Sequence, residues 1–339
     1  MNMKKKTCRV LLLSVLAALL VGGGAVGYML WDSLFRQPVM PAQGMWVYIH
    51  DGEVEPADAL DVPALHWALD YYDFEPKLAE GRLDGAYHFE GTSSAMTVAR
   101  RITRHQQTAV KVSFNNIRLK EQWAGRVAQK LMCDSLDLLQ AMTDTAFLRL
   151  SGMDEANVIS VLLPDTYEVY WNTPASELMA RMLKEYNRFW NDERRAKAEA
   201  LGMTPREVSV LCSTAEEETN NRQERGIVAR LYWNRLQRGM LLQADPTVKF
   251  ALGDFGLKRI LLRHLEVDSP YNTYKNEGLP PGPLRMVEKA TIDAFLNSTA
   301  HEYLYMCAKP ELNGLHNFAK TLSEHNRNAE AYHQAIRKL

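Results

Sequence analysis

The stretch PREVSVLCSTAEEETNN, residues 205–221, is the part of this chain on which its interpretation rests. Thr204, just before it, can cap a helix, with Pro205 at the first helical position. Glu207 follows the cap by three residues, as in a capping box. We therefore predict that a helix begins at Pro205 and that its first turn is well defined.

The three consecutive glutamates in this helix point in different directions. Residues three and four apart form one buried stripe: Val208, Leu211 and Ala215. Glu218 is the next member of that series and lies about 20° from Leu211 around the helix. We expect Glu218 to lie along the buried face, whereas Glu216 and Glu217 should face solvent.

A glutamate in this position resists ionisation for two reasons. Partial desolvation raises the pKa of a carboxyl group, and the negative end of the helix dipole raises it further. A carboxylic acid that is still protonated near neutral pH is suited to be a general acid. The pattern alone also allows a buried carboxylate that forms a salt bridge with Arg222 or Arg225, so both interpretations are open at this point.

The N-terminal region has the pattern of a membrane segment. A basic start, with Lys4, Lys5, Lys6 and Arg9, precedes residues 10–31, which carry no charge. That length can span a bilayer, and the flanking charges predict a cytoplasmic N-terminus with the remaining chain outside. Residues 10–31 are thus expected to contact the lipid of the inner membrane. The alternative is a cleaved signal peptide, with residues 10–21 as its apolar core and 25–27 as its cleavage site.

Composition excludes one class of partner. The chain has 339 residues and a formal net charge of −1, and its length allows two domains of ordinary size. It contains no basic block and no aromatic and basic stripe, so a nucleic-acid partner has no support.

The cysteines do not form a disulfide framework. Three lie beyond the apolar segment, namely Cys133, Cys212 and Cys307, and their neighbours are apolar. An odd and sparse set with such neighbours predicts buried free thiols. Neither CxxC nor HExxH occurs, so no metal site is expected.

The remaining pattern predicts an α+β protein. Strands are expected at 46–49, 85–89 and 108–114, with a helix from about 95 to 102. Residues 119–148 and 176–221 read as helices, and 158–170 reads as a buried strand that leads into a turn at 164–166. A further helix over about 223–238 should end at Gly239. Short strands, turns and a closing helix complete the chain.

Several short motifs occur together and in order. Residues 164–167 read PDTY, 238–248 read RGMLLQADPTV, 271–274 read YNTY, and 278–283 read GLPPGP. HNF at 316–318 and EHN at 324–326 follow. With Glu218-Thr219, these motifs closely resemble the endolytic murein transglycosylase family, also called MltG or YceG-like. The resemblance is strongest over about 208–329, and residues 85–87 with the following helix look like the family's LysM-like module.

The resemblance implies a domain order. It comprises a cytoplasmic tail (1–9), a transmembrane anchor (10–31), a linker (32–44) and a LysM-like α+β module (45–115). A helical connecting region (116–204) and a transglycosylase catalytic domain of helices and short strands (205–339) follow.

The resemblance also implies an activity. Members would be lyases that cleave the β-1,4 bond between N-acetylmuramic acid and N-acetylglucosamine within nascent peptidoglycan strands, which leaves 1,6-anhydromuramoyl ends and terminates strand elongation. No cofactor is implied, and the partners would be glycan strands and peptidoglycan synthases (penicillin-binding proteins). The family's catalytic glutamate maps onto Glu218. Substrate contacts are expected from Gln243, Asp245, Tyr271, Asn272, His316 and Asn326.

Simpler roles exist for most of these residues. Asp245 before a proline can be a turn residue, and Tyr271 and Tyr274 can be core aromatics. Asn234 and Asn272 can cap backbone, His316 and His325 can be structural, and Glu224 can be a surface charge of a first helical turn. Three features depart from the family's usual pattern, namely Ala244 in place of threonine, the turn at 284–287, and the longer segment at 309–313.

Two other functions therefore stay open. One is a non-catalytic, membrane-anchored glycan-binding protein. The other is a muramidase that hydrolyses the same bond with Asp245 as a second carboxylate beside Glu218.

Overall fold

The protein is described by a computed structural model of residues 2–337, with side chains from Ser14 onward. The chain separates into two compact units. The first unit is Met1–Lys111 with Glu168–Asn172, and the second is Val112–Tyr167 with Thr173–Leu339.

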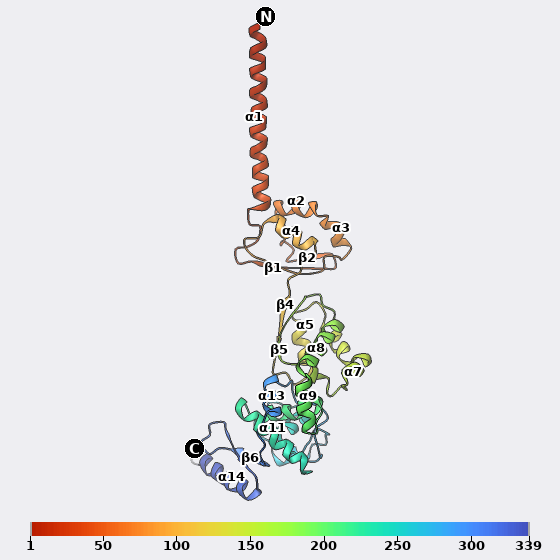
Figure 1. Ribbon diagram of the computed structural model, residues 1–339, viewed down its shortest axis with the longest axis vertical. Helices are drawn as coiled ribbons and strands as arrows, with labels where there is room; N and C mark the ends of the chain where they lie inside the picture. Colours follow the sequence, from red (N-terminus) through yellow and green to blue (C-terminus); the bar gives the residue numbers. More distant parts are fainter. Residues whose placement is uncertain (1, 338–339) are drawn as a thin grey trace. The chain divides into compact units, whose positions relative to one another are not determined.

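The chain begins with one long helix, α1 (Asn2–Phe35) (Figure 1). Its part Ser14–Phe35 has a mean hydropathy of 1.7 and is long and apolar enough to cross a membrane. The helix continues without a break through residues 25–27. The expected apolar N-terminal helix is therefore confirmed, and its length and composition fit both an anchor and a signal sequence.

A three-stranded antiparallel sheet forms one layer of the first unit, in the order β2-β1-β3. Its strands are β1 (Met45–His50), β2 (Glu53–Glu55) and β3 (Gly85–Phe89), and Val47 lies opposite Tyr87. Alternate residues of β1 point to opposite faces, so Val47 and Ile49 are fully buried in the core. The strands predicted at 46–49 and 85–89 are confirmed.

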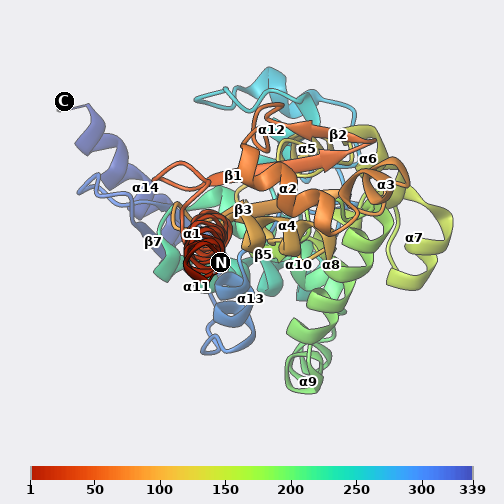
Figure 2. The same ribbon diagram turned by 90° about the horizontal axis from the view of Figure 1, so that it is seen from above.

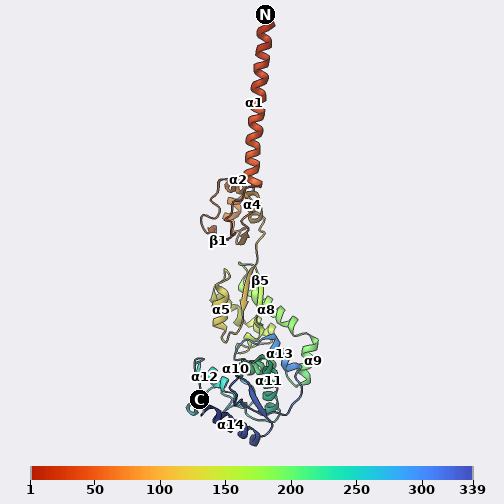
Figure 3. The same cartoon turned by 90° about the vertical axis from the view of Figure 1, so that its left-hand side faces the viewer.

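Three helices cover that apolar face of the sheet (Figures 1 and 3). They are α2 (Pro63–Tyr71), α3 (Phe74–Ala79) and α4 (Ala95–Thr103). Leu65 and Leu69 of α2, with Val98 and Ile102 of α4, complete the core. The helix predicted from about 95 to 102 is confirmed.

In the second unit the structure corrects one predicted strand. Strands β4 (Val110–Phe114) and β5 (Asp165–Val169) pair as a two-stranded sheet, and the strand expected over 108–114 is confirmed. The strand predicted over 158–170 is only partly right. Val158–Val161 is a short 3-10 helix, η1, whereas Asp165–Val169 is strand β5, which begins where a turn was expected. Val158 to Leu163 is apolar except for Ser160 and buried on all sides, and such a run has no periodicity that separates strand from helix.

Most of the second unit is helical, as predicted for 119–148 and 176–221. The helices before the site are α5 (Lys120–Ala128), α6 (Ser135–Thr143), α7 (Thr145–Ser151), α8 (Ala175–Phe189) and α9 (Asp192–Ala200), with α9 following directly on α8 (Figure 2).

Helix α10 (Pro205–Glu218) is the centre of this unit. It begins with the predicted capping box, in which Thr204 Oγ1 accepts from Glu207 N at 3.3 Å and Glu207 Oε2 accepts from Thr204 N at 2.7 Å. Every residue from Val208 to Glu216 is buried, because η1, α9, α11, α12 and α13 all pack against the helix.

Helix α11 (Arg222–Gln237) returns alongside α10 and ends two residues before Gly239, as predicted within the usual error of helix ends. It also packs closely on α13 (Lys289–Leu296). A Cβ at Gly226 would lie 2.7 Å from the carbonyl oxygen of Ala294, so only glycine permits this approach.

The closing part contains the short elements that the sequence predicted, with two helices that it did not. These two are α12 (Asp245–Leu252) and α13. A second 3-10 helix, η2 (Leu262–Glu266), lies between them. Strands β6 (Tyr305–Ala308) and β7 (His316–Ala319) form a hairpin that packs against the closing helix α14 (Leu322–Ile336) (Figure 1).

The three cysteines whose side chains the structure describes are free, as predicted, although only one of these three is fully buried. Cys212 lies inside α10, whereas Cys133 and Cys307 are half-buried.

Candidate active site

A pocket of about 320 Å³ opens at the C-terminal end of α10. Its walls come from α10, α11, the start of α12, β6 and α14. The lining residues are Glu218, Leu231, Tyr232, Arg235, Leu242, Gln243, Asp245, Tyr274, Tyr305, Met306 and His325. The structure thus brings together three of the residues that the sequence singled out, namely Glu218, Gln243 and Asp245. We call this the Glu218 pocket.

Glu218 is the last residue of α10 and is partly buried in this pocket. Its Oε1 accepts a hydrogen bond of 2.6 Å from the hydroxyl of Tyr232 on α11. Burial raises the pKa of Glu218 to about 7, the bond from Tyr232 opposes that rise, and the charge of Asp245 adds to it. A large share of Glu218 is therefore protonated near neutral pH, as a general acid requires.

The arginines that could have neutralised Glu218 bind other carboxylates. Arg225 Nη1 lies 3.2 Å from Glu288 Oε1 and 3.5 Å from Glu216 Oε1. Arg222 Nη2 lies 3.2 Å from Glu288 Oε2. The alternative of a Glu218 that is salt-bridged to Arg222 or Arg225 is therefore wrong.

A second tyrosine and carboxylate pair faces the same pocket. Asp245 is the first residue of α12, and its Oδ1 accepts a hydrogen bond of 2.5 Å from the hydroxyl of Tyr274. Burial, followed by this bond and the charge of Asp245, raises the pKa of Tyr274, so its hydroxyl keeps its proton and donates. Tyr274 is thus a polar wall of the pocket and not only a core aromatic.

The segment before Asp245 is fixed by hydrogen bonds to Thr273. Gln243 has a φ of +51°, and its backbone N–H donates to the Thr273 carbonyl at 3.1 Å. The N–H of Ala244 donates to Thr273 Oγ1, also at 3.1 Å. These bonds join the 238–248 and 271–274 motifs, which are separated in the sequence, into one wall of the pocket.

Arg235 and His325 are among the lining residues that were not predicted as site residues. Arg235 donates from Nε to the Leu304 carbonyl at 2.6 Å and from Nη1 to the Leu242 carbonyl at 2.8 Å, so it holds two walls together. His325 stacks on Tyr305 with ring centroids 5.4 Å apart. Burial and the charge of Arg235 lower the pKa of His325, which keeps it neutral near pH 7. The only sequence signal for Arg235 is its spacing of three residues from Tyr232 on one helix face.

The structure corrects the expected exposure of the other two glutamates. Glu216 has a fully buried side chain, placed between Arg225 at 3.5 Å and Arg285 at 3.4 Å. Glu217 is mostly buried and binds Arg118 at 2.8 Å and Arg285 at 3.3 Å. Helical phase gave the wrong answer because α10 is packed on several sides, so the face opposite its apolar stripe meets arginines and not water.

His316 and Asn326 do not line the Glu218 pocket. His316 begins β7, and its Nδ1 lies 2.8 Å from Oε2 of Glu224 on α11. Glu224 is therefore buried and is not the surface charge that was expected. Asn326 is exposed on α14, one residue after His325, which does line the pocket.

Tyr271 and Asn272 are also outside the Glu218 pocket. Asn272 is fully buried, and its Nδ2 donates to the carbonyls of Leu265 at 2.8 Å and Val267 at 2.9 Å. The ring of Tyr271 packs on Phe250 with centroids 4.6 Å apart. These contacts fit the simpler roles of a backbone cap and a core aromatic.

Among the side chains from Ser14 onward, one group has the spacing of metal ligands: His50, Asp51 and Asp84. These residues belong to the first unit and are exposed or half-buried. None of them lines the Glu218 pocket.

Comparison with known proteins identifies the family to which this protein belongs. The pattern of the YceG-like family matches residues 62–331, which is most of the chain, so this protein belongs to the YceG-like family. A protein of Bacillus subtilis (strain 168) named endolytic murein transglycosylase is 37% identical over 174 residues. That match covers 50% of this chain and 47% of the relative.

Other similar proteins carry the same name or fold. An endolytic murein transglycosylase of Streptococcus pneumoniae (strain D39) is 29% identical over 175 residues, which are 49% of this chain and 31% of that protein. The chain thus aligns with less than half the length of either named relative. A crystal structure of a yceG-like protein from Listeria monocytogenes has a TM-score of 0.58 at 24% identity. It covers 85% of this chain and 99% of the other, and it shows that the fold is shared.

Proposed function

We propose that this protein is an endolytic lytic transglycosylase, a lyase that cleaves the β-1,4 bond between N-acetylmuramic acid and N-acetylglucosamine within nascent peptidoglycan strands. The observation that carries the proposal is Glu218, which lies in a pocket that raises its pKa to about 7. Membership of the YceG-like family and the names of the relatives support the same substrate.

In the first step Glu218 acts as the general acid. Its protonated carboxyl donates to the glycosidic oxygen, so the C1–O4 bond breaks and N-acetylglucosamine leaves with a new 4-hydroxyl. Positive charge then develops at C1 of the muramoyl ring. The carboxylate of Asp245 stabilises that charge, and the hydroxyl of Tyr274 holds this carboxylate in place.

In the second step the same residue acts as the base. Tyr232 donates to the Glu218 carboxylate and stabilises it after proton loss. Glu218 then takes the proton of the muramoyl C6 hydroxyl, whose oxygen bonds to C1. This closes the 1,6-anhydro ring and restores the acid, so the reaction consumes no water and one carboxyl group can perform both proton transfers.

The remaining assignments follow from the apolar N-terminal segment with its flanking charges and from the sequence resemblance. The apolar helix α1 anchors the protein in the inner membrane with its N-terminus in the cytoplasm and its catalytic domain outside. Residues 45–115 form a LysM-like module that binds glycan. Cleavage of strands as they are made terminates their elongation, and peptidoglycan synthases (penicillin-binding proteins) are the partners of that process.

A second candidate function is favoured by the position of Asp245 in the same pocket. With two carboxylates, the site could instead be a hydrolase in which one of them handles water or forms a covalent intermediate. The two candidates differ in product, because hydrolysis leaves a reducing muramoyl end whereas the lyase leaves an anhydro end that is lighter by one water.

Mass spectrometry of the products from un-crosslinked glycan strands tests the proposal. Wild-type protein should give internal cleavage with anhydromuramoyl ends. Glu218→Gln should abolish cleavage and keep strand binding, because it removes only the acid. Glu277→Gln, an exposed glutamate of the 271–283 region, is the matched control and should cleave normally. If the folded wild-type protein binds strands and cleaves none, only a non-catalytic glycan-binding role is left.

A further inference from the structure

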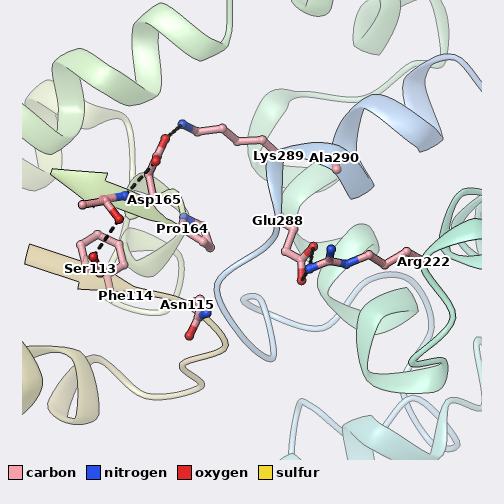
Figure 4. Close-up of a pocket in the computed structure, with 10 residues that line it drawn as sticks. Ser113, Phe114, Asn115, Pro164, Asp165, Arg222, Glu288, Lys289 and Ala290 are labelled. Atoms are coloured by element: carbon pink, nitrogen blue, oxygen red, sulfur yellow. Dashed lines mark hydrogen bonds and ion pairs between the residues drawn. The ribbon is translucent and has the colours of Figure 1, made fainter.

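A second pocket of the second unit, with a volume of about 420 Å³, lies where β4 and β5 meet the first turns of α11 and α13 (Figure 4). Its lining residues are Ser113, Phe114, Asn115, Pro164, Asp165, Thr166, Arg222, Glu288, Lys289 and Ala290. None of them lines the Glu218 pocket, and the proposed reaction uses none of them. We call it the paired-charge pocket.

Two ion pairs supply the charged groups in the wall of this pocket. Lys289 Nζ lies 2.6 Å from Asp165 Oδ2, and Arg222 Nη2 lies 3.2 Å from Glu288 Oε2. Figure 4 shows the pairs on different sides of the pocket. The side chains of Asp165 and Arg222 are 52% and 75% exposed. The exposed pair of Lys289 and Asp165 contributes little to stability, so a ligand can replace it at little cost. In the second pair Glu288 is only 24% exposed, and it keeps Arg225 as a partner when Arg222 binds a ligand.

The numbers of charges indicate the class of ligand. The walls offer two cations and two carboxylates, and the hydroxyls of Ser113 and Thr166 add neutral polar groups. A phosphate group or a polyanion would be repelled by the carboxylates, and an uncharged sugar could hydrogen-bond to the four charged groups but would neutralise none of them. A zwitterion is complementary to all of them.

We propose that the paired-charge pocket binds a short zwitterionic peptide, with its negative groups on Arg222 and Lys289 and its positive groups on Asp165 and Glu288. The peptide stems that peptidoglycan carries on its muramoyl residues have this chemistry, and their identification as the ligand rests on the proposed function. The pocket would then recognise strands that still bear stems.

One residue connects this pocket to the helix that carries Glu218. The backbone N–H of Glu288 donates to Glu216 Oε1 at 2.9 Å, and the Glu288 carboxylate lies 3.2 Å from Arg225, which also binds Glu216. Glu216 precedes Glu218 by two residues on α10. Glu288, which lines the paired-charge pocket, is therefore fixed to α10 two residues before Glu218, so the glycan and the peptide of one substrate can be held in a fixed relation.

Calorimetric titration of the full chain in detergent tests the peptide site directly. The probe is a synthetic tetrapeptide with one side-chain amine and a free C-terminal carboxylate. Arg222→Gln and Lys289→Gln should each weaken its binding by roughly fivefold or more. Arg238→Gln, an exposed arginine just beyond the other end of α11, is the matched control and should bind as the wild type does. Acetylation of the amine should weaken binding to the wild type by a similar factor.

A kinetic comparison separates the pocket from the reaction. With stem-bearing strands, Arg222→Gln should raise KM roughly fivefold and leave kcat unchanged, and with strands stripped of peptides by an amidase it should match the wild type. No binding of the tetrapeptide at millimolar concentration, equal binding by Arg222→Gln and Arg238→Gln, or equal KM effects on both kinds of strand would each overturn the inference. If the peptide binds as expected but no strand is cleaved, the proposed reaction is wrong and the peptide site stands.

Discussion

The hydrogen bond from Tyr232 to Glu218 makes a quantitative prediction about pH dependence. This bond stabilises the ionised form of Glu218, whose pKa is about 7 when the bond is present. Tyr232→Phe removes the donor and keeps the ring. A hydrogen bond to a charged group contributes about 1.5–3 kcal/mol, and one pKa unit corresponds to about 1.4 kcal/mol. The pKa of Glu218 should therefore rise by roughly one to two units.

The sign follows from the role of the protonated acid. The rate of cleavage falls as pH rises through the pKa of Glu218, because the general acid loses its proton. In Tyr232→Phe the falling limb of kcat/KM should move to higher pH by roughly one to two units. The assay is kcat/KM for strand cleavage from pH 5 to pH 9.5. A shift to lower pH, or none, would refute the assignment of Glu218 as the acid that Tyr232 stabilises.

Tyr305→Phe is the matched control for this measurement. Tyr305 lines the same pocket and stacks on His325, but its hydroxyl makes no hydrogen bond to Glu218. In Tyr305→Phe the falling limb of kcat/KM should stay at the same pH as in the wild type. A shift of equal size in both variants would mean that a general change in the pocket, and not the single hydrogen bond, sets the pKa.

The structure also makes two predictions about the other carboxylates. Glu216→Gln removes the carboxylate that Arg225 and Arg285 share, but Arg225 keeps Glu288 and Arg285 keeps Glu217. The free energy of unfolding should therefore fall by about 1–3 kcal/mol in chemical denaturation. The surface change Glu193→Gln should have no such effect, and equal stability of the two variants would contradict the buried network. Asp245→Asn should lower kcat/KM by roughly a hundredfold and move the falling limb to lower pH, because the charge of Asp245 raises the pKa of Glu218. A falling limb that moves to higher pH in Asp245→Asn would contradict this effect of the Asp245 charge on the pKa of Glu218.

Local patterns in the sequence were sufficient for many elements of the fold. The capping box at Thr204 defined the start of α10, and alternation defined β4. These signals lie within a few neighbouring residues, so no knowledge of tertiary contacts is needed. The strand prediction for the apolar run at 158–163 was wrong for the opposite reason. A run that is buried on all sides has no periodicity that could separate a strand from a helix.

The site was only partly predictable for a related reason. Helical phase placed Glu218 in the buried stripe, and the structure places it in the pocket. Phase could not place Glu216, because its partners Arg225 and Arg285 reach it from another helix and from a distant loop. Asn326 and His325 are adjacent in sequence, yet only His325 faces the pocket, and that depends on how α14 packs on β6.

The central claim is that Glu218 alone breaks the bond, with the sugar's own C6 hydroxyl as nucleophile. Digestion of un-crosslinked glycan strands in ¹⁸O-labelled water, followed by mass spectrometry of the new muramoyl ends, tests it most directly. We predict anhydro ends that contain no ¹⁸O, because no water enters the product. New muramoyl ends that are reducing and carry ¹⁸O would contradict the claim and establish hydrolysis.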